Sequence, residues 1–182
     1  SNYGWEELIE LIYTLNFNLS EIDSILNVDR VLWTFAVNSV LANLDTYNGL
    51  YQHNYYLYQT NYGLFQMIPW DLDNSFVGAI MGWDYWNPST VYEYDPYYTG
   101  PSLGGTTQPW EERPLLYKLL NNSQYRKIYT AHINTIIEES LDTSVIRANV
   151  NNLQSLAYNA ANQYGNKDFT CLLYTSPRPR DQ

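Results

Sequence analysis

Most hydrophobic positions along the chain recur at the spacing of amphipathic helices. The first predicted helix covers residues 5–15, with glutamates opposite an apolar face made of Trp5, Leu8, Ile9, Ile12 and Leu15. A short helix is expected from a Ser20 cap through Leu26. A longer helix follows Val28, with Asp29 as its cap, and its apolar positions continue to Leu44, so that helix would place Asp45 at its C-terminal end.

The last third of the chain shows the same pattern. Pro114 suits the first turn of a helix that Asn121-Asn122 breaks. Ser123 is then expected to cap a helix reaching Ser140, and Thr143 or Ser144 to begin a final helix that Gly165 ends.

The middle of the chain instead predicts one β-hairpin. Residues 54–59 and 64–68 suit two strands, and Asn61-Tyr62-Gly63 supplies the turn, where glycine is free to take a positive φ. Pro69 should end the second strand because it has no N–H to donate. The overall expectation is a mainly α (α+β) fold with about six helices around a small hairpin.

Residues 74–110 form a long segment rich in glycine, proline and aromatic side chains. Segments of this length in a compact domain are usually functional or disordered, and the aromatic content favours order. Two interpretations stay open, namely an Ω-like cover over the helices and a lid that binds substrate.

Composition places the chain among globular proteins. It has 182 residues, 45% hydrophobic and 16% aromatic, which suits one domain with a real core. The net charge of −10 argues against nucleic acid and anionic membrane surfaces as partners. No apolar run approaches the roughly 20 residues of a membrane span. The single Cys171 allows no internal disulfide.

The end of the chain differs from the rest. From about Thr170 it gains two prolines and two arginines, and it resembles translated vector sequence. We therefore expect one domain over residues 1–169 and a non-native tail over residues 170–182.

Acidic side chains are concentrated in the middle of the chain. No Lys or Arg occurs between Arg30 and Arg113, whereas eight Asp and Glu residues do. These acids either lie on solvated loops or attract a cation. Hard divalent ions take carboxylate and amide oxygens together with waters and phosphates, which suits Asp71, Asp73 and Asn54 as ligands. A calcium loop of the EF-hand type is excluded, because Phe76 and Gly82 stand where Gly and Glu are needed.

Three linked motifs carry a family resemblance. The runs LANLDTYNG, HNYYLY and IPWDLDNSF, with a glycine turn between the last two, resemble the central signature of the CotH kinase family. The later run RPLLYKLLNNSQYRKIY resembles the helical region that follows the active site in that family. The family comprises spore-coat and secreted proteins with an atypical protein-kinase-like fold, so the resemblance implies the C-terminal lobe of a kinase-like domain.

The resemblance also implies roles for individual residues. Asp45 corresponds to the catalytic-loop aspartate, which would orient a Ser or Thr hydroxyl of a protein substrate and accept its proton. Asp71 corresponds to the metal-binding aspartate, with Asn54 and Asp73 as further ligands of Mg²⁺ or Mn²⁺ on ATP. His53 either touches a phosphate or is a structural hydrogen bonder. The implied location is secreted, at the cell surface or in the spore coat.

One departure from the kinase pattern bears on activity. Kinases hold the ATP phosphates with a lysine on a β-rich N-terminal lobe, and here no lysine precedes Lys118. We therefore expect a C-terminal-lobe fragment that is weakly active by itself. Two alternatives stay open: a carbohydrate-binding or glycoside-cleaving module that uses the carboxylates with Trp83, Trp86 and Trp110, and a pseudokinase or interaction module without chemistry.

Overall fold

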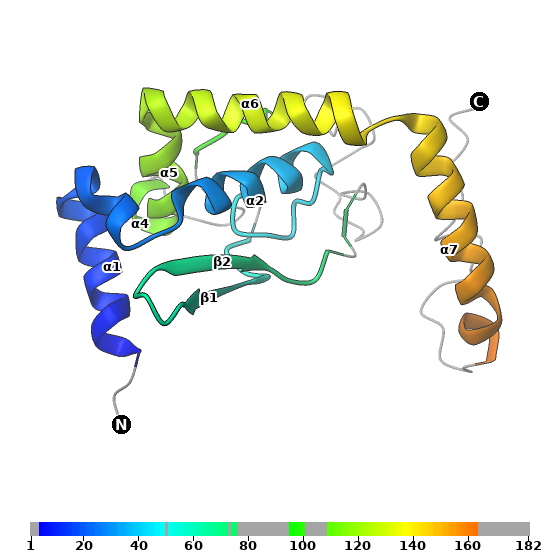
Figure 1. Cartoon of the computed structure of the whole chain (residues 1–182), viewed down its shortest axis with the longest axis horizontal. Helices are drawn as coiled ribbons and strands as arrows, with labels where there is room; N and C mark the ends of the chain where they lie inside the picture. The colour runs from blue at the N-terminus through cyan, green and yellow to red at the C-terminus, as the bar shows by residue number, and fades with distance from the viewer. Residues whose placement is uncertain (1–3, 50, 73, 76–94, 101–108, 164–182) are drawn as a thin grey trace. The chain divides into compact units, whose positions relative to one another are not determined.

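A computed structural model describes residues 4–49, 51–72, 74–75, 95–100 and 109–163 (Figure 1). The elements, in chain order, are α1 (Trp5–Phe17), the 3₁₀ helix η1 (Leu19–Ser24), α2 (Val28–Val40), β1 (Tyr55–Gln59), β2 (Phe65–Pro69), α4 (Pro109–Glu112), α5 (Pro114–Asn121), α6 (Ser123–Ser140) and α7 (Thr143–Gln163). The predicted mainly α fold with a small hairpin is confirmed.

The chain divides into two compact units, residues 1–137 and 138–182. The hairpin and the helices before α6 belong to the first unit, and α7 belongs to the second. None of the helices in the described ranges is long and apolar enough to cross a bilayer.

The hairpin forms where it was predicted, with each strand beginning one residue later than expected. Its strands are antiparallel, with Tyr55 opposite Pro69 and Gln59 opposite Phe65. Gly63 has a φ of 83° in the turn, and its N–H donates to the Thr60 carbonyl at 2.9 Å. Pro69 is the last residue of β2, as its missing N–H led us to expect.

The residues just before α2 are hydrogen-bonded to the first residue of β2. Phe65 N donates to Ile25 O at 2.8 Å, and Asn27 N donates to Phe65 O at 2.9 Å. One turn further along, Arg30 Nε donates to Met67 O at 3.0 Å. These bonds fix α2 and the hairpin to each other. The residues that follow α2 and those that follow β2 therefore have fixed positions relative to one another.

The core of the first unit is built around α2. Val31, Leu32 and Phe35 are fully buried, together with Leu119 and Leu120 of α5. Burying an aliphatic side chain of this size stabilises the fold by about 1.5–3 kcal/mol. The buried side chains of α2 lie within the apolar stretch that was predicted for that helix.

The prediction for the end of α2 was wrong. The helix stops at Val40, because Ala42 adopts a left-handed φ of 48° and Asn43 N bonds to Asn38 O at 2.8 Å. Leu44 is still buried, but as part of a loop. Asp45 therefore lies in a loop beyond the helix and not at its C-terminus.

The helix caps also differ from the sequence expectation. The side chain of Asn27, and not Asp29, caps α2 by accepting from Arg30 N at 3.0 Å. Asn122 and not Ser123 caps α6, and Asp142 and not Thr143 or Ser144 caps α7. In all three helices an Asn or Asp directly before the first turn reaches the amides two or three residues on, and this geometry decides between adjacent candidates.

The buried face of α1 agrees with the predicted one only in part. Leu11 and Leu15 are buried, whereas Trp5, Ile9 and Ile12 are 66%, 62% and 51% exposed. Helix α1 contacts η1 and α5. Helical spacing indicated an amphipathic helix, but it could not say which of two adjacent apolar stripes its neighbours would cover.

Several sequence expectations fall outside the described residues. These are the proposed ligand Asp73, the tryptophans Trp83 and Trp86, the helix end at Gly165 and the tail over residues 170–182. Most of the long aromatic segment lies outside them as well, so both interpretations of it stay open.

Candidate active site

Asp45 lies at the centre of a cluster of polar side chains between α2 and the hairpin. It is 6% exposed, and its Oδ1 is bonded to His53 Nε2. Its Oδ2 accepts from Asn74 Nδ2 at 2.8 Å and from Asn54 Nδ2 at 3.2 Å. Asn54 Nδ2 also donates to the Asp45 carbonyl oxygen at 2.8 Å. One buried carboxylate thus receives hydrogen bonds from three side chains.

The open end of the hairpin carries two residues in the left-handed conformation. Asn54 precedes β1 with a φ of 57°, and Asp71 follows β2 with a φ of 52°. Asn and Asp tolerate this region best among residues other than glycine. Trp70 N donates to Asn54 O at 3.0 Å, so Asn54 and Asp71 lie on neighbouring strand ends. Between the described residues, no hydrogen bond joins the Asp71 side chain to the Asp45 cluster.

Buried amides support the loop that carries Asp45. Asn38 of α2 donates through Nδ2 to Thr46 Oγ1 and to Asn48 Oδ1, both at 3.2 Å. Asn48 in turn donates to Phe35 O at 3.2 Å and to Ser39 Oγ at 3.1 Å. Because buried polar groups are costly unless bonded, this network specifies one conformation of the loop.

A buried arginine holds the other end of the same loop. Arg113 is 1% exposed, and its Nη1 donates to Gly49 O at 2.7 Å while its Nη2 donates to Gly100 O. Its guanidinium carbon lies 5.6 Å from the centre of the Tyr98 ring. Gly49 itself is required, because a Cβ there would overlap the carbonyl of Leu44.

Tyr47 connects the loop to α5. Its hydroxyl accepts from Leu115 N at 3.1 Å, and its ring stacks on Phe35 with centroids 5.8 Å apart. Burial raises the pKa of the Tyr47 hydroxyl well above its ordinary value. The phenol therefore stays neutral and acts as a fixed structural group.

Two oxygen groups at this site suit a hard divalent cation. Asn54 uses its nitrogen for Asp45, which leaves Oδ1 for a ligand, and the Asp71 side chain is exposed. No cluster of three or more His, Cys, Asp or Glu side chains suited to a metal occurs in the described ranges. One carboxylate and one amide oxygen fit Mg²⁺ or Mn²⁺, which keep waters and phosphate oxygens as their remaining ligands.

The structure thus brings three predicted site residues, Asp45, His53 and Asn54, into direct contact. Sequence reasoning missed Asn74 and Arg113. The only available signals were that Asn74 is an amide close to the predicted carboxylates and that Arg113 is the basic residue that ends the acidic stretch. Neither signal says that the side chain turns inward.

The family of the chain follows from comparison with known proteins. The profile of the family described as CotH kinase protein matches residues 1–171. The chain belongs to the CotH kinase protein family. Neither the curated proteins nor the solved structures contain a match to it. Membership suggests a kinase-related function.

Proposed function

We propose that this CotH kinase family chain transfers the γ-phosphate of ATP to a Ser or Thr hydroxyl of a protein, with Asp45 as the group that receives the hydroxyl proton. The observation that carries the proposal is the Asp45 carboxylate, buried beside the open hairpin end and fixed by His53, Asn54 and Asn74. Family membership supports an acceptor protein in the spore coat or outside the cell.

The hydrogen bonds of the Asp45 carboxylate leave one lone pair that could accept from a substrate hydroxyl. An ionised carboxylate offers about four lone-pair sites, and side chains use three of them. A hydroxyl on the fourth site would be held for in-line attack on the γ-phosphorus. The acceptor oxygen bonds to phosphorus, the bond to the β–γ bridging oxygen breaks, ADP leaves, and the proton passes to Asp45.

Asp71 and Asn54 would hold the Mg²⁺ or Mn²⁺ that accompanies ATP, with Asp73 as a further predicted ligand. When bound, the metal neutralises charge on the phosphates. The His53 side chain is 53% exposed while one ring nitrogen bonds to Asp45. This exposure supports a contact of the other ring nitrogen with ATP, in addition to orienting Asp45.

A thermal-shift titration tests the nucleotide site. The chain is melted with ATP, with Mn²⁺ or Mg²⁺, and with both, in the original sequence and as Asp71→Asn. Asparagine is chosen because alanine would also strain the left-handed backbone at this position. Ligand at 100 times its Kd stabilises a protein by about 2.7 kcal/mol, which for a chain of this size is roughly 5–10 °C in Tm.

We expect a Tm rise that requires both metal and ATP and that disappears in Asp71→Asn. The exposed Glu139→Gln removes one acidic charge elsewhere and should keep the shift. Absence of any shift, or an equal shift in Asp71→Asn, would contradict the assignment of Asp71. Phosphate transfer itself is followed with radiolabelled ATP and a Ser-containing peptide, where Asp45→Asn should abolish even weak labelling.

A further inference from the structure

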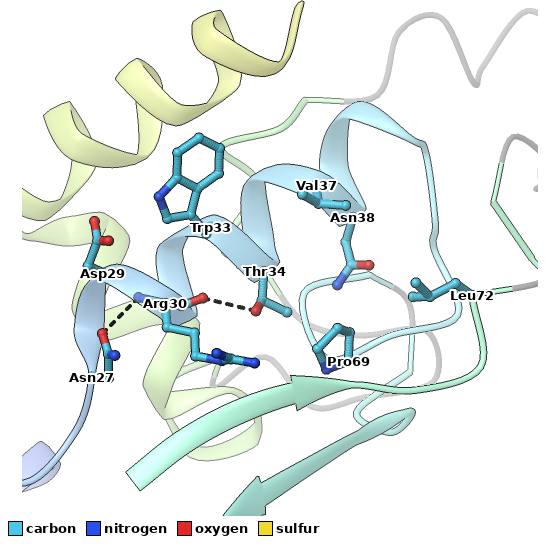
Figure 2. Close-up of a pocket in the computed structure, with 9 residues that line it drawn as sticks. All are labelled: Asn27, Asp29, Arg30, Trp33, Thr34, Val37, Asn38, Pro69 and Leu72. Carbon is cyan, nitrogen blue, oxygen red and sulfur yellow. Dashed lines mark hydrogen bonds between the residues drawn. The ribbon is translucent and has the colours of Figure 1, made fainter. Parts of the chain in front are cut away.

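A pocket lies between α2 and the end of β2. Its volume is about 440 Å³, within the range of ligand pockets. Figure 2 shows its walls, which include Arg30, Trp33, Val37, Asn38, Pro69 and Leu72. The pocket combines apolar surface with one cationic group.

Arg30 has an unusual place in the charge pattern. It is the only Lys or Arg in the first 112 residues. Its Nε donates to Met67 O at 3.0 Å, which fixes the guanidinium between α2 and β2, where Figure 2 shows it directed towards Pro69. Its Nη1 and Nη2 make no hydrogen bond to any residue that the structure describes. The fork of donors is therefore held in place for an anionic ligand.

The apolar part of the pocket is equally well fixed. The Trp33 ring stacks on His132 with centroids 3.9 Å apart, and His132 Nε2 bonds to Asp29 at 2.8 Å. Val37, Pro69 and Leu72 complete the wall, and Leu72 is 41% exposed. An apolar side chain that entered the pocket would bury this surface without a rearrangement of Trp33.

The pocket adjoins the proposed site of phosphate transfer. Leu72 directly follows the proposed metal ligand Asp71. On the opposite wall, the buried Asn38 donates to Thr46 in the loop that carries Asp45. A ligand that fills the pocket would therefore lie next to both loops of that site.

We propose that this pocket docks an extended segment of the acceptor protein, with an acidic side chain on Arg30 and an apolar side chain against Trp33, Val37, Pro69 and Leu72. The inference rests on the proposed function. The charges that line the pocket favour a peptide over a nucleotide as its ligand. A single carboxylate matches the guanidinium fork, whereas a triphosphate would meet one cation and the carboxylate of Asp29 in the same pocket.

Fluorescence anisotropy with short labelled peptides tests the proposal. The probe series contains one glutamate and one leucine separated by zero to three glycines, in both orders. Matched peptides carry lysine for glutamate or glycine for leucine. All titrations omit metal and nucleotide, so a negative result here is independent of the Asp71 thermal-shift result.

At least one glutamate–leucine peptide should bind. Replacing its glutamate by lysine, or Arg30→Met in the protein, should weaken binding by about tenfold or more, because a charge-assisted pair is lost. Leu72→Ala should weaken it by several fold. The control Arg147→Met removes an exposed arginine on α7 and should leave the affinity unchanged.

Three results would overturn the proposal: no binding across the series, equal binding of the lysine peptide, or an unchanged affinity in Arg30→Met. Metal-free ATP that displaces the peptide, with its own affinity lost in Arg30→Met, would assign the pocket to the nucleotide instead. If Arg30→Met melts below the assay temperature, the lysine peptide and Leu72→Ala decide the question.

Discussion

Replacing Arg113 by methionine should destabilise the fold strongly, although the residue lies outside the Asp45 cluster. The change keeps an unbranched side chain of similar length but removes the donors to Gly49 O and Gly100 O. A buried acceptor left without a partner costs about 1–3 kcal/mol. The bond to Gly49 O is buried, whereas the bond to Gly100 O is only partly buried and its loss costs less. We therefore expect a total loss of about 2–4 kcal/mol, a large share of the roughly 5–15 kcal/mol of a typical domain.

Arg113→Lys should fall between the original chain and the methionine variant. An ammonium group retains the charge but cannot present the parallel donors that the guanidinium offers to two carbonyls. We expect it to keep one of the two bonds and to lose about half as much stability. A graded series of this kind separates loss of donors from loss of volume.

The assay is urea unfolding, because urea leaves the ionic strength unchanged. Arg126→Met is a matched control, because Arg126 makes the same two kinds of contact while it is exposed. Its Nη1 donates to Leu120 O at 3.4 Å, and its guanidinium carbon lies 4.5 Å from the centre of the Tyr97 ring. Exposed contacts of this type contribute less than about 1 kcal/mol. An Arg113→Met chain that unfolds at the same urea concentration as Arg126→Met would refute the reasoning.

Three further substitutions test the loop that carries Asp45, the Asp45 cluster and the contact between Tyr125 and Asp23. Gly49→Ala should shift the urea midpoint downwards and broaden the Asp45-loop amide signals in NMR, because the new Cβ overlaps a backbone carbonyl; an unchanged midpoint would contradict the loop geometry. Asn74→Asp places a second carboxylate against Asp45, where Asn74 now donates at 2.8 Å. The raised pKa of the pair makes the variant lose stability as the pH rises from about 4 to 8, and a pH-independent difference would argue against this contact. Burial, followed by the hydrogen bond to Asp23 and the charge of that carboxylate, raises the pKa of Tyr125 to about 12. Its stabilising effect is therefore complete below about pH 10 and is lost as the pH approaches 12, so Tyr125→Phe should flatten the alkaline part of the stability curve measured by urea unfolding; an identical slope in both chains would count against it.

The sequence predicted those features of the fold that depend on neighbours along the chain. The hairpin, its turn at Gly63 and its end at Pro69 follow from local backbone rules, and the structure has all three. The apolar period likewise gave the buried face of α2.

Features that depend on distant partners could not be read in this way. The buried stripe of α1 is selected by η1 and α5, and the end of α2 by a left-handed Ala42 that has no strong sequence signal. For the candidate site, the resemblance singled out Asp45 and Asp71, but it could not indicate that Asn74, 29 residues away from Asp45, donates to its carboxylate.

The sequence separations within the Asp45 cluster have a consequence for how the molecule folds. Its bonds join residues 8, 9 and 29 positions apart, whereas Arg113 reaches Gly49 across 64 positions and Tyr125 reaches Asp23 across 102. Short loops close at a lower entropic cost and sooner than long ones. The cluster should therefore form early, around α2 and the hairpin, before α5 and α6 dock. Substitutions at the late contacts would then act mainly by accelerating unfolding, and those within the cluster by slowing folding.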